Sequence, residues 1–112
     1  MAAELLTGIV GIQAPTTLTI ATGVISITQG AHFLTSESGT TDDLDTINID
    51  AGVTYSGYTP LVILKATATH TITIKHNTGN ILLNAAADFS LTASKALLLW
   101  YEPAAAKWHN LA

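Results

Sequence analysis

The chain has 112 residues and a mass of 11.7 kDa, which suits a single domain. Four lysines, no arginine and eight acidic residues give a net charge of −4, which argues against nucleic-acid binding, because that needs a basic face. The absence of cysteine excludes a disulfide framework and a thiolate metal site.

Charged residues make up only 11% of the chain, against about 25% in a typical soluble domain. Threonine, serine and asparagine take their place. Burying a hydroxyl group costs much less than burying a charge, so such a surface suits permanent contact with other protein. Threonine also favours strands, and an ordinary β-rich protein would explain the same composition.

The first fifteen residues, MAAELLTGIVGIQAP, lack the positive start and cleavage site of a secretory signal. Nowhere does an apolar run approach the ~20 residues of a membrane span. We expect residues 1–15 to form an extended arm that lies on a neighbouring subunit. Its candidate contact residues are Leu5, Leu6, Ile9, Val10 and Ile12.

Short alternating segments follow at the spacing of a β-sandwich or barrel, at residues 17–20, 24–28 and 31–35. Residues 36–43, SESGTTDD, predict an exposed loop. Residues 44–49 alternate again, and 50–60 mix turn residues with two tyrosines. The nearly continuous apolar run at 61–68 predicts a central strand covered on both faces.

The segment HTITIKHNTGNILLN, residues 70–84, predicts a hairpin in which Asn77 or Gly79 takes a positive φ. A short strand is expected at 89–92, and a final hairpin at 96–111. Trp100 and Trp108 flank that hairpin, where aromatic side chains favour a place in the core over a ligand platform. The alternative there is a sugar-binding surface.

Together these signals predict an all-β protein: a small antiparallel β-sandwich or jelly-roll-like barrel of about eight to ten short strands. Residues 16–112 form one β domain behind the arm.

Few residues suggest chemistry. No nucleophile elbow and no glycine-rich phosphate loop is present, and the acidic residues cluster in one loop and the next strand. The sequence therefore predicts no enzyme and no cofactor. Asp43 and Asp45 are candidates for holding a hard cation such as calcium, with a plain acidic loop as the alternative. His70 and His76 lie on one side of a strand about 20 Å apart, too far to share a metal.

The stretch from Asp42 to Leu111 resembles small virion proteins of tailed bacteriophages. It contains DDLDTINI, then GYTPLVILKATATHTITIKH, then GNILLNAAADFSLTASKALLLWYEPAAAKWHNL. One departure is Ala85–Ala86, where the pattern has glycines. The residues that carry the resemblance are Ile72, Ile81, Leu83, Asn84, Asp88, Phe89, Leu91, Leu97, Leu99, Tyr101 and Trp108.

The resemblance implies a module that is usually trimeric and occurs in capsid decoration (cement) proteins and in the tips of tail fibres or spikes. Because the chain starts at Met1 and ends soon after its last predicted strand, we expect a small whole gene product. We therefore expect a homotrimeric decoration protein on the outer surface of the virion, bound to the major capsid protein. The alternative is a receptor- or carbohydrate-binding tip, with Tyr55 and Tyr58 as ligand contacts.

Overall fold

The structure is a computed structural model that describes residues 12–55 and 59–111. Within these ranges the chain forms eleven short strands and no helix, which confirms the predicted all-β fold class. No helix among the described residues could therefore cross a membrane. The strands are β1 (Thr16–Thr19), β2 (Val24–Ile27), β3 (Ala31–Thr35), β4 (Thr41–Leu44), β5 (Thr46–Ile49), β6 (Leu61–Ala66), β7 (Thr71–Ile74), β8 (Ile81–Leu82), β9 (Phe89–Leu91), β10 (Leu97–Glu102) and β11 (Lys107–Asn110).

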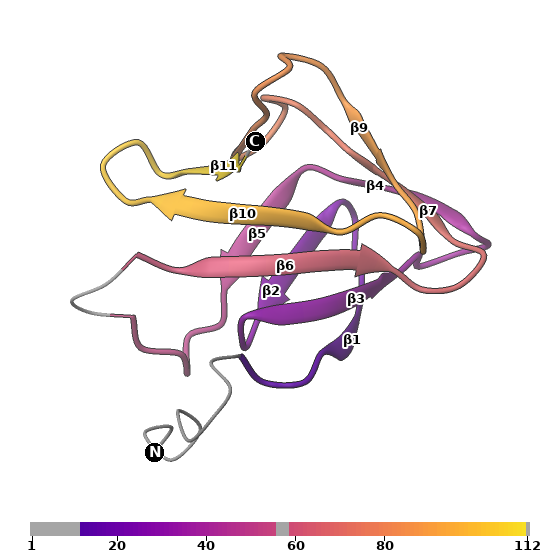
Figure 1. Ribbon diagram of the computed structural model, residues 1–112, viewed down its shortest axis with the longest axis horizontal. Helices are drawn as coiled ribbons and strands as arrows, with labels where there is room; N and C mark the ends of the chain where they lie inside the picture. The colour runs from indigo at the N-terminus through magenta and orange to yellow at the C-terminus, as the bar shows by residue number, and fades with distance from the viewer. Residues whose placement is uncertain (1–11, 56–58, 112) are drawn as a thin grey trace.

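The strands form three sheets that enclose one core. The largest has six strands in the order β1-β3-β6-β10-β11-β8, and it faces the viewer in Figure 1. A two-stranded sheet, β2-β5, lies behind it, and a three-stranded sheet, β4-β7-β9, lies toward the right of the view. The arrangement is sandwich-like, and β4 occupies the end of the segment predicted to be an exposed loop.

Most of the strand pairings are parallel, so the predicted antiparallel pairing is wrong for much of the fold. Among the described residues five of eight pairings are parallel, and only those of β10 with β6 and β11 and of β7 with β9 are antiparallel. The chain winds in three successive turns, β1–β2, then β3–β4–β5, then β6–β7, and each turn stacks on the one before, as in a short β-helix. Apolar alternation is the same in parallel and antiparallel strands, so the sequence pattern did not separate them.

The register of the six-stranded sheet shows the length of each turn. Thr16 pairs with His32, and His32 pairs with Leu64, so the first turn takes sixteen residues and the second thirty-two. The second turn is longer because it contains β4, the segment 36–40 before it and the connection from β5 to β6.

Inward-facing side chains of all three sheets meet in one apolar core. The largest side chains that are fully buried include Trp108, whose Nε1 donates a hydrogen bond to the Ile47 carbonyl oxygen at 3.1 Å. The predicted core position of Trp108 is therefore confirmed. Other fully buried members of this core are Ile20, Leu34, Leu44, Val62, Leu64, Ile72, Ile74, Ile81, Leu91 and Leu99.

The predicted hairpin at residues 70–84 does not form. β7 pairs with β4 and β9, whereas β8 pairs with β11, so the segment between them is a corner of the winding chain. Asn77 takes the predicted positive φ of 55°. Gly79 instead allows a close approach: a Cβ atom there would fall on the Asp45 carbonyl oxygen.

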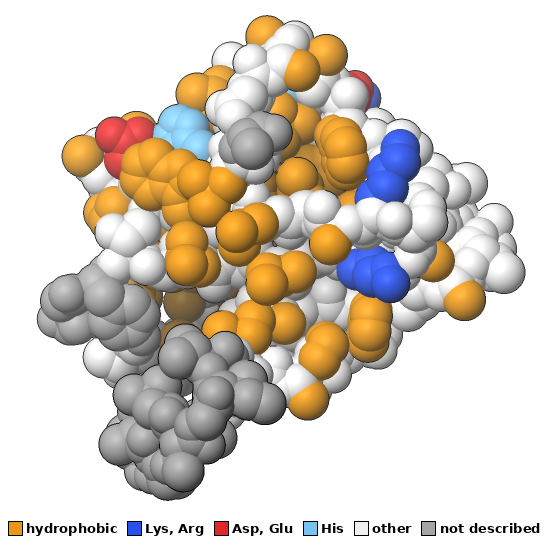
Figure 2. Space-filling model, in the orientation of Figure 1, with side chains coloured by type: hydrophobic (Ala, Val, Ile, Leu, Met, Phe, Trp, Pro, Cys, Tyr) orange, Lys and Arg blue, Asp and Glu red, His pale blue; other side chains and the backbone are white. Residues whose placement is uncertain are grey.

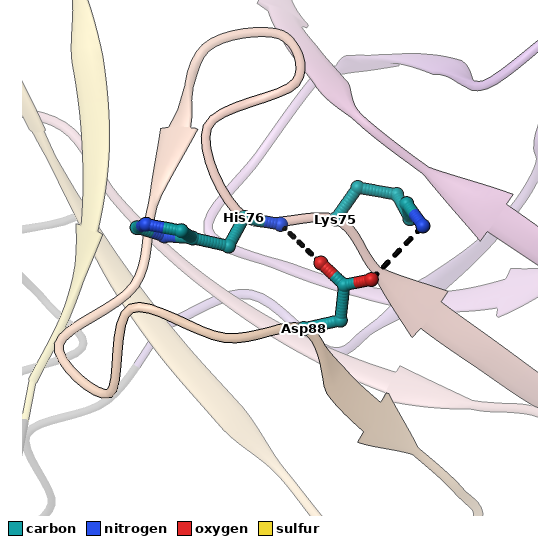
Figure 3. Close-up of polar contacts among 3 residues, drawn as sticks. All are labelled: Lys75, His76 and Asp88. Carbon is teal, nitrogen blue, oxygen red and sulfur yellow. Dashed lines mark hydrogen bonds and ion pairs between the residues drawn. The ribbon is translucent and has the colours of Figure 1, made fainter.

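Asp88 ties this corner to the start of β9, as Figure 3 shows. One carboxylate oxygen accepts the His76 backbone N–H at 2.8 Å, and the other lies 2.9 Å from the Lys75 ammonium nitrogen. These contacts, the backbone hydrogen bond first, lower the pKa of Asp88, and the hydrogen bond to Asp88 raises the pKa of Lys75. Because the Lys75 and Asp88 side chains both remain in contact with solvent, the ion pair contributes little to stability.

At Ala85–Ala86, where glycines were expected, the backbone of Ala86 takes a conformation that favours glycine. Ala86 adopts a φ of 55°, in the left-handed region that favours glycine. A glycine at this position would therefore suit the turn that this chain makes with alanine.

We predict that Gly79→Ala destabilises the fold by about 1–3 kcal/mol. The new methyl group would overlap the backbone of Asp45, the residue just before β5. Urea unfolding followed by tryptophan fluorescence measures the effect. Gly30→Ala is the matched control: its Cβ would lie 3.6 Å from Ile12, an ordinary contact. Equal stabilities for the two variants would show that the third turn is not pressed against β5.

His32 fastens the first turn to the second. Its side chain is only 1% exposed. Nε2 accepts the Thr28 backbone N–H at 3.2 Å, so Nδ1 carries the proton and faces the Thr16 carbonyl oxygen at 3.2 Å. Burial lowers the pKa of His32 below its ordinary 6.5, although the hydrogen bond to Thr16 opposes that shift.

We predict that stability falls on acidification because of His32. The unfolded chain takes up the proton near pH 6.5 and the folded chain only at lower pH, so this contribution is complete above pH 6.5 and is lost as pH falls through the folded pKa. His32 adds at most about 1.4 kcal/mol per pH unit to the slope of the unfolding free energy against pH. Urea unfolding of His32→Gln between neutral and acidic pH should give a flatter pH dependence than the wild type, and parallel curves would contradict this.

Candidate functional site

The outer surface of the six-stranded sheet is apolar. Burial alternates along β6, so the prediction that this strand is covered on both faces is wrong: Leu61 is 53% exposed and Ile63 is 37% exposed. The strand is central in its sheet, but among the described residues no second layer covers its outer side chains. Figure 2 shows hydrophobic side chains gathered across this surface.

The strand register identifies which side chains share this surface, because residues directly opposite each other in a sheet point to the same face. Ile63 pairs with Ala31 on one side and with Leu98 on the other. Leu61 pairs with Trp100, which pairs with His109. We call this surface the outer face; its apolar members are Ala31, Phe33, Leu61, Ile63, Leu82, Leu98 and Trp100.

Trp100 therefore lies on the outer face, and its predicted place in the core is wrong. Its ring stacks on the His109 imidazole, with ring centroids 5.0 Å apart and an interplanar angle of 29°. The His109 Nε2 atom in turn lies 2.9 Å from a carboxylate oxygen of Glu102, at the end of the same sheet. The aromatic side chain is thus held in place while part of it stays exposed.

The charged side chains that the register places on the outer face are Lys65 on β6 and the cross-strand pair Glu102 and Lys107 at one end of the sheet. Lys65 points outward from β6 in line with Phe33, and these two residues border a shallow hollow of about 240 Å³ that Pro15 and Ile63 also line. The hollow gives the surface relief that a flat sheet lacks. An apolar surface with such relief is typical of a protein contact rather than of a solvated sheet.

The predicted arm can be followed only at its end. Of the five candidate contact residues, Leu5, Leu6, Ile9 and Val10 lie outside the described residues. Ile12 is 55% exposed and rests near Gly30, at the turn before β3. The Gln29 side-chain amide donates a hydrogen bond to the Ala14 carbonyl oxygen at 2.5 Å, so residues 12–15 run along the margin of the outer face.

A second candidate is a cleft of about 390 Å³ beside β5. Tyr55 and Tyr101 form its aromatic wall, with ring centroids 6.4 Å apart and planes at 84°. Tyr101 also packs on the buried Trp108, 5.1 Å between centroids. Of the two tyrosines predicted as ligand contacts, Tyr55 thus lies in a cleft, and Tyr58 lies outside the described residues.

Asn48 and Asp50 are the exposed polar side chains of this cleft, and neither was predicted as a ligand contact. Asn48 lies within β5 and Asp50 directly follows it, and a tyrosine comes five residues after Asp50. That combination of an amide, a carboxylate and an aromatic ring near one strand end was the available signal.

The cation candidates do not form a cluster. Asp43 is exposed on β4, whereas an Asp45 carboxylate oxygen accepts a hydrogen bond from the Thr46 hydroxyl at 2.7 Å. In the described part of the chain, no group of three or more metal-ligating side chains comes together. His70 and His76 instead accept hydrogen bonds from the backbone N–H groups of Ser36 and Leu83, and so hold turns of the chain.

Comparisons with protein-family models, with curated proteins and with solved structures find no match to this chain.

Proposed function

We propose that this protein is a non-enzymatic structural protein of a bacteriophage virion. In this proposal it forms a homotrimer on the outside of the capsid and stabilises the shell by binding the major capsid protein. The observation that carries the proposal is the outer face, an apolar sheet surface with Leu61 and Ile63 exposed. The resemblance of residues 42–111 to small phage virion proteins is the reason for proposing a virion as the assembly.

The energetics support burial of this surface in an assembly. Each side chain that leaves water on association contributes about 25 cal/mol per Å² of apolar area. Glu102 and Lys107 pair with each other at one end of the outer face, which leaves Lys65 as the charged side chain beside Phe33, so little charge has to be desolvated around the exposed Leu61 and Ile63. A trimer would also cover sheet edges that a single copy leaves to solvent.

The alternative, a tail tip that binds a carbohydrate receptor, is favoured by the cleft between Tyr55 and Tyr101. Both functions use an oligomer, so the oligomeric state does not separate them. Immunogold labelling of the virion does: label over the head supports decoration, and label confined to the tail supports the receptor-binding tip.

We predict that the purified wild-type protein is a trimer and that Ile63→Lys is largely monomeric, as measured by size-exclusion chromatography with light scattering. Burying one ammonium group per interface costs at least about 2 kcal/mol, or roughly 30-fold in the dissociation constant. Ile63 is already partly exposed, so the variant should fold.

Ser26→Lys is the matched control, because Ser26 is exposed on β2, in the sheet behind the core. It adds the same charge away from the outer face and should stay trimeric. A wild-type protein that remains monomeric at high concentration, and does not sediment with phage heads, would overturn the proposal.

A further inference from the structure

The cleft beside β5 exists because the third turn of the chain covers only half of that strand. After β7 the chain meets the free edge of β5 through Asn80, whose side-chain amide accepts from the Ile47 N–H and donates to the Ile47 carbonyl oxygen, both at 2.8 Å. Beyond Ile47 no strand of the described part of the chain pairs with this edge of β5, and the cleft lies there, lined by Asn48, Ile49 and Asp50.

The uncovered edge presents backbone groups as well as side chains. The Asp50 N–H bonds to the Ile27 carbonyl oxygen on the β2 side. Because successive residues of a strand point their peptide groups to opposite edges, Ile49 directs its N–H and carbonyl oxygen the same way as Ile47, toward the cleft. One donor and one acceptor thus stand between two exposed polar side chains.

The opposite wall is aromatic and rigid. Tyr101 is fixed by its contact with Trp108, which is fully buried and hydrogen-bonded. Tyr55 meets Tyr101 edge to face, so the two rings present surfaces at a right angle. A rigid aromatic wall opposite a polar edge suits a ligand that is apolar on its faces and polar around its rim.

The charge of the cleft narrows the chemical class of the ligand further. Asp50 is the one charged group among the described residues that line it, and no lysine, arginine or histidine is present to hold an anion. A second carboxylate, which glycoside hydrolysis needs, is also absent from this lining. The lining therefore suits binding of a neutral ligand without turnover.

We propose that this cleft binds one neutral pyranose unit of a polysaccharide, wherever on the virion the protein resides. The C–H face of the sugar packs on Tyr55, and its hydroxyl groups bond to Asn48, Asp50 and the Ile49 backbone. A saccharide fits better than a peptide. An added β-strand needs a continuous row of backbone partners, whereas the edge here offers Ile49 alone before the chain turns at residues 50–53.

The test is a titration of the ¹⁵N-labelled full chain, followed by NMR, with methyl glycosides and trisaccharides of glucose, galactose, mannose and N-acetylglucosamine. We expect saturable shifts at residues 48–55 and at Tyr101 for at least one probe, with a dissociation constant of about 1 mM or below. Tyr55→Ala should weaken that binding about threefold to tenfold, and Tyr55→Phe, which keeps the ring, should restore it.

Asp50→Asn tests the polar side. Asparagine keeps the acceptor that the Gly52 N–H uses at 3.0 Å, so the turn is preserved while the charge is lost. We expect weaker binding, about threefold to tenfold, because hydrogen bonds to a charged acceptor are stronger than those to a neutral one. Asp43→Asn, an exposed aspartate on β4, is the matched control and should bind as the wild type does.

The proposal is overturned if no probe gives saturable shifts, or if the shifts map outside the cleft. It is also overturned if an extended peptide shifts the cleft residues while every saccharide is silent. Should Tyr55→Ala fail to fold, Asp50→Asn decides the question by itself. Loss of trimerisation in Ile63→Lys leaves this result unchanged, so the two proposals fail separately.

Discussion

The paired hydrogen bonds between the Asn80 side chain and the Ile47 backbone determine how the last turn of the chain joins the rest. The Asn80 side-chain amide presents an N–H donor and a carbonyl acceptor at the spacing of a peptide group, so it satisfies a strand edge as a neighbouring strand would. This contact draws Gly79 against Asp45 and leaves room for no side chain there. It also ends the sheet early, which creates the cleft.

The buried Trp108 depends on the same constraint. Its indole N–H reaches the Ile47 carbonyl oxygen, which also accepts from Asn80, so the donor of a large aromatic side chain is satisfied inside an apolar core. Tyr101 then rests on this fixed ring and forms a wall of the cleft. One edge of one strand thus fixes both the end of the core and the shape of the candidate site.

The sequence predicted the strands well because alternating apolar residues and turn residues are local signals. Thr22 and Gly23, both with positive φ, turn the chain between the segments predicted at 17–20 and 24–28, and Leu97 to Asn110 make the expected final hairpin. Strand partners are not local. Asn77 turns the chain as predicted, yet the next strand pairs with β11 rather than with β7, because the corner at Gly79 and Asn80 is held by β5.

The candidate site was predicted only where an exposed aromatic residue marked it. Tyr55 stands in a turn-rich segment and was identified. Asn48 and Asp50 line the cleft because, in the described part of the chain, no further strand pairs with β5 there. A local sequence pattern does not show which strands pair. The run LVIL was read as doubly covered because both faces of the strand are apolar. An apolar residue that is exposed on the surface of a sheet looks the same in sequence as one buried within the chain.

Parallel stacking has a consequence for how this molecule changes size. Sixteen residues carry the chain from Thr16 to its neighbour His32, and each such layer adds about 4.8 Å of height while leaving the cross-section of the core alone. Gain or loss of whole layers would therefore lengthen or shorten the body in fixed steps.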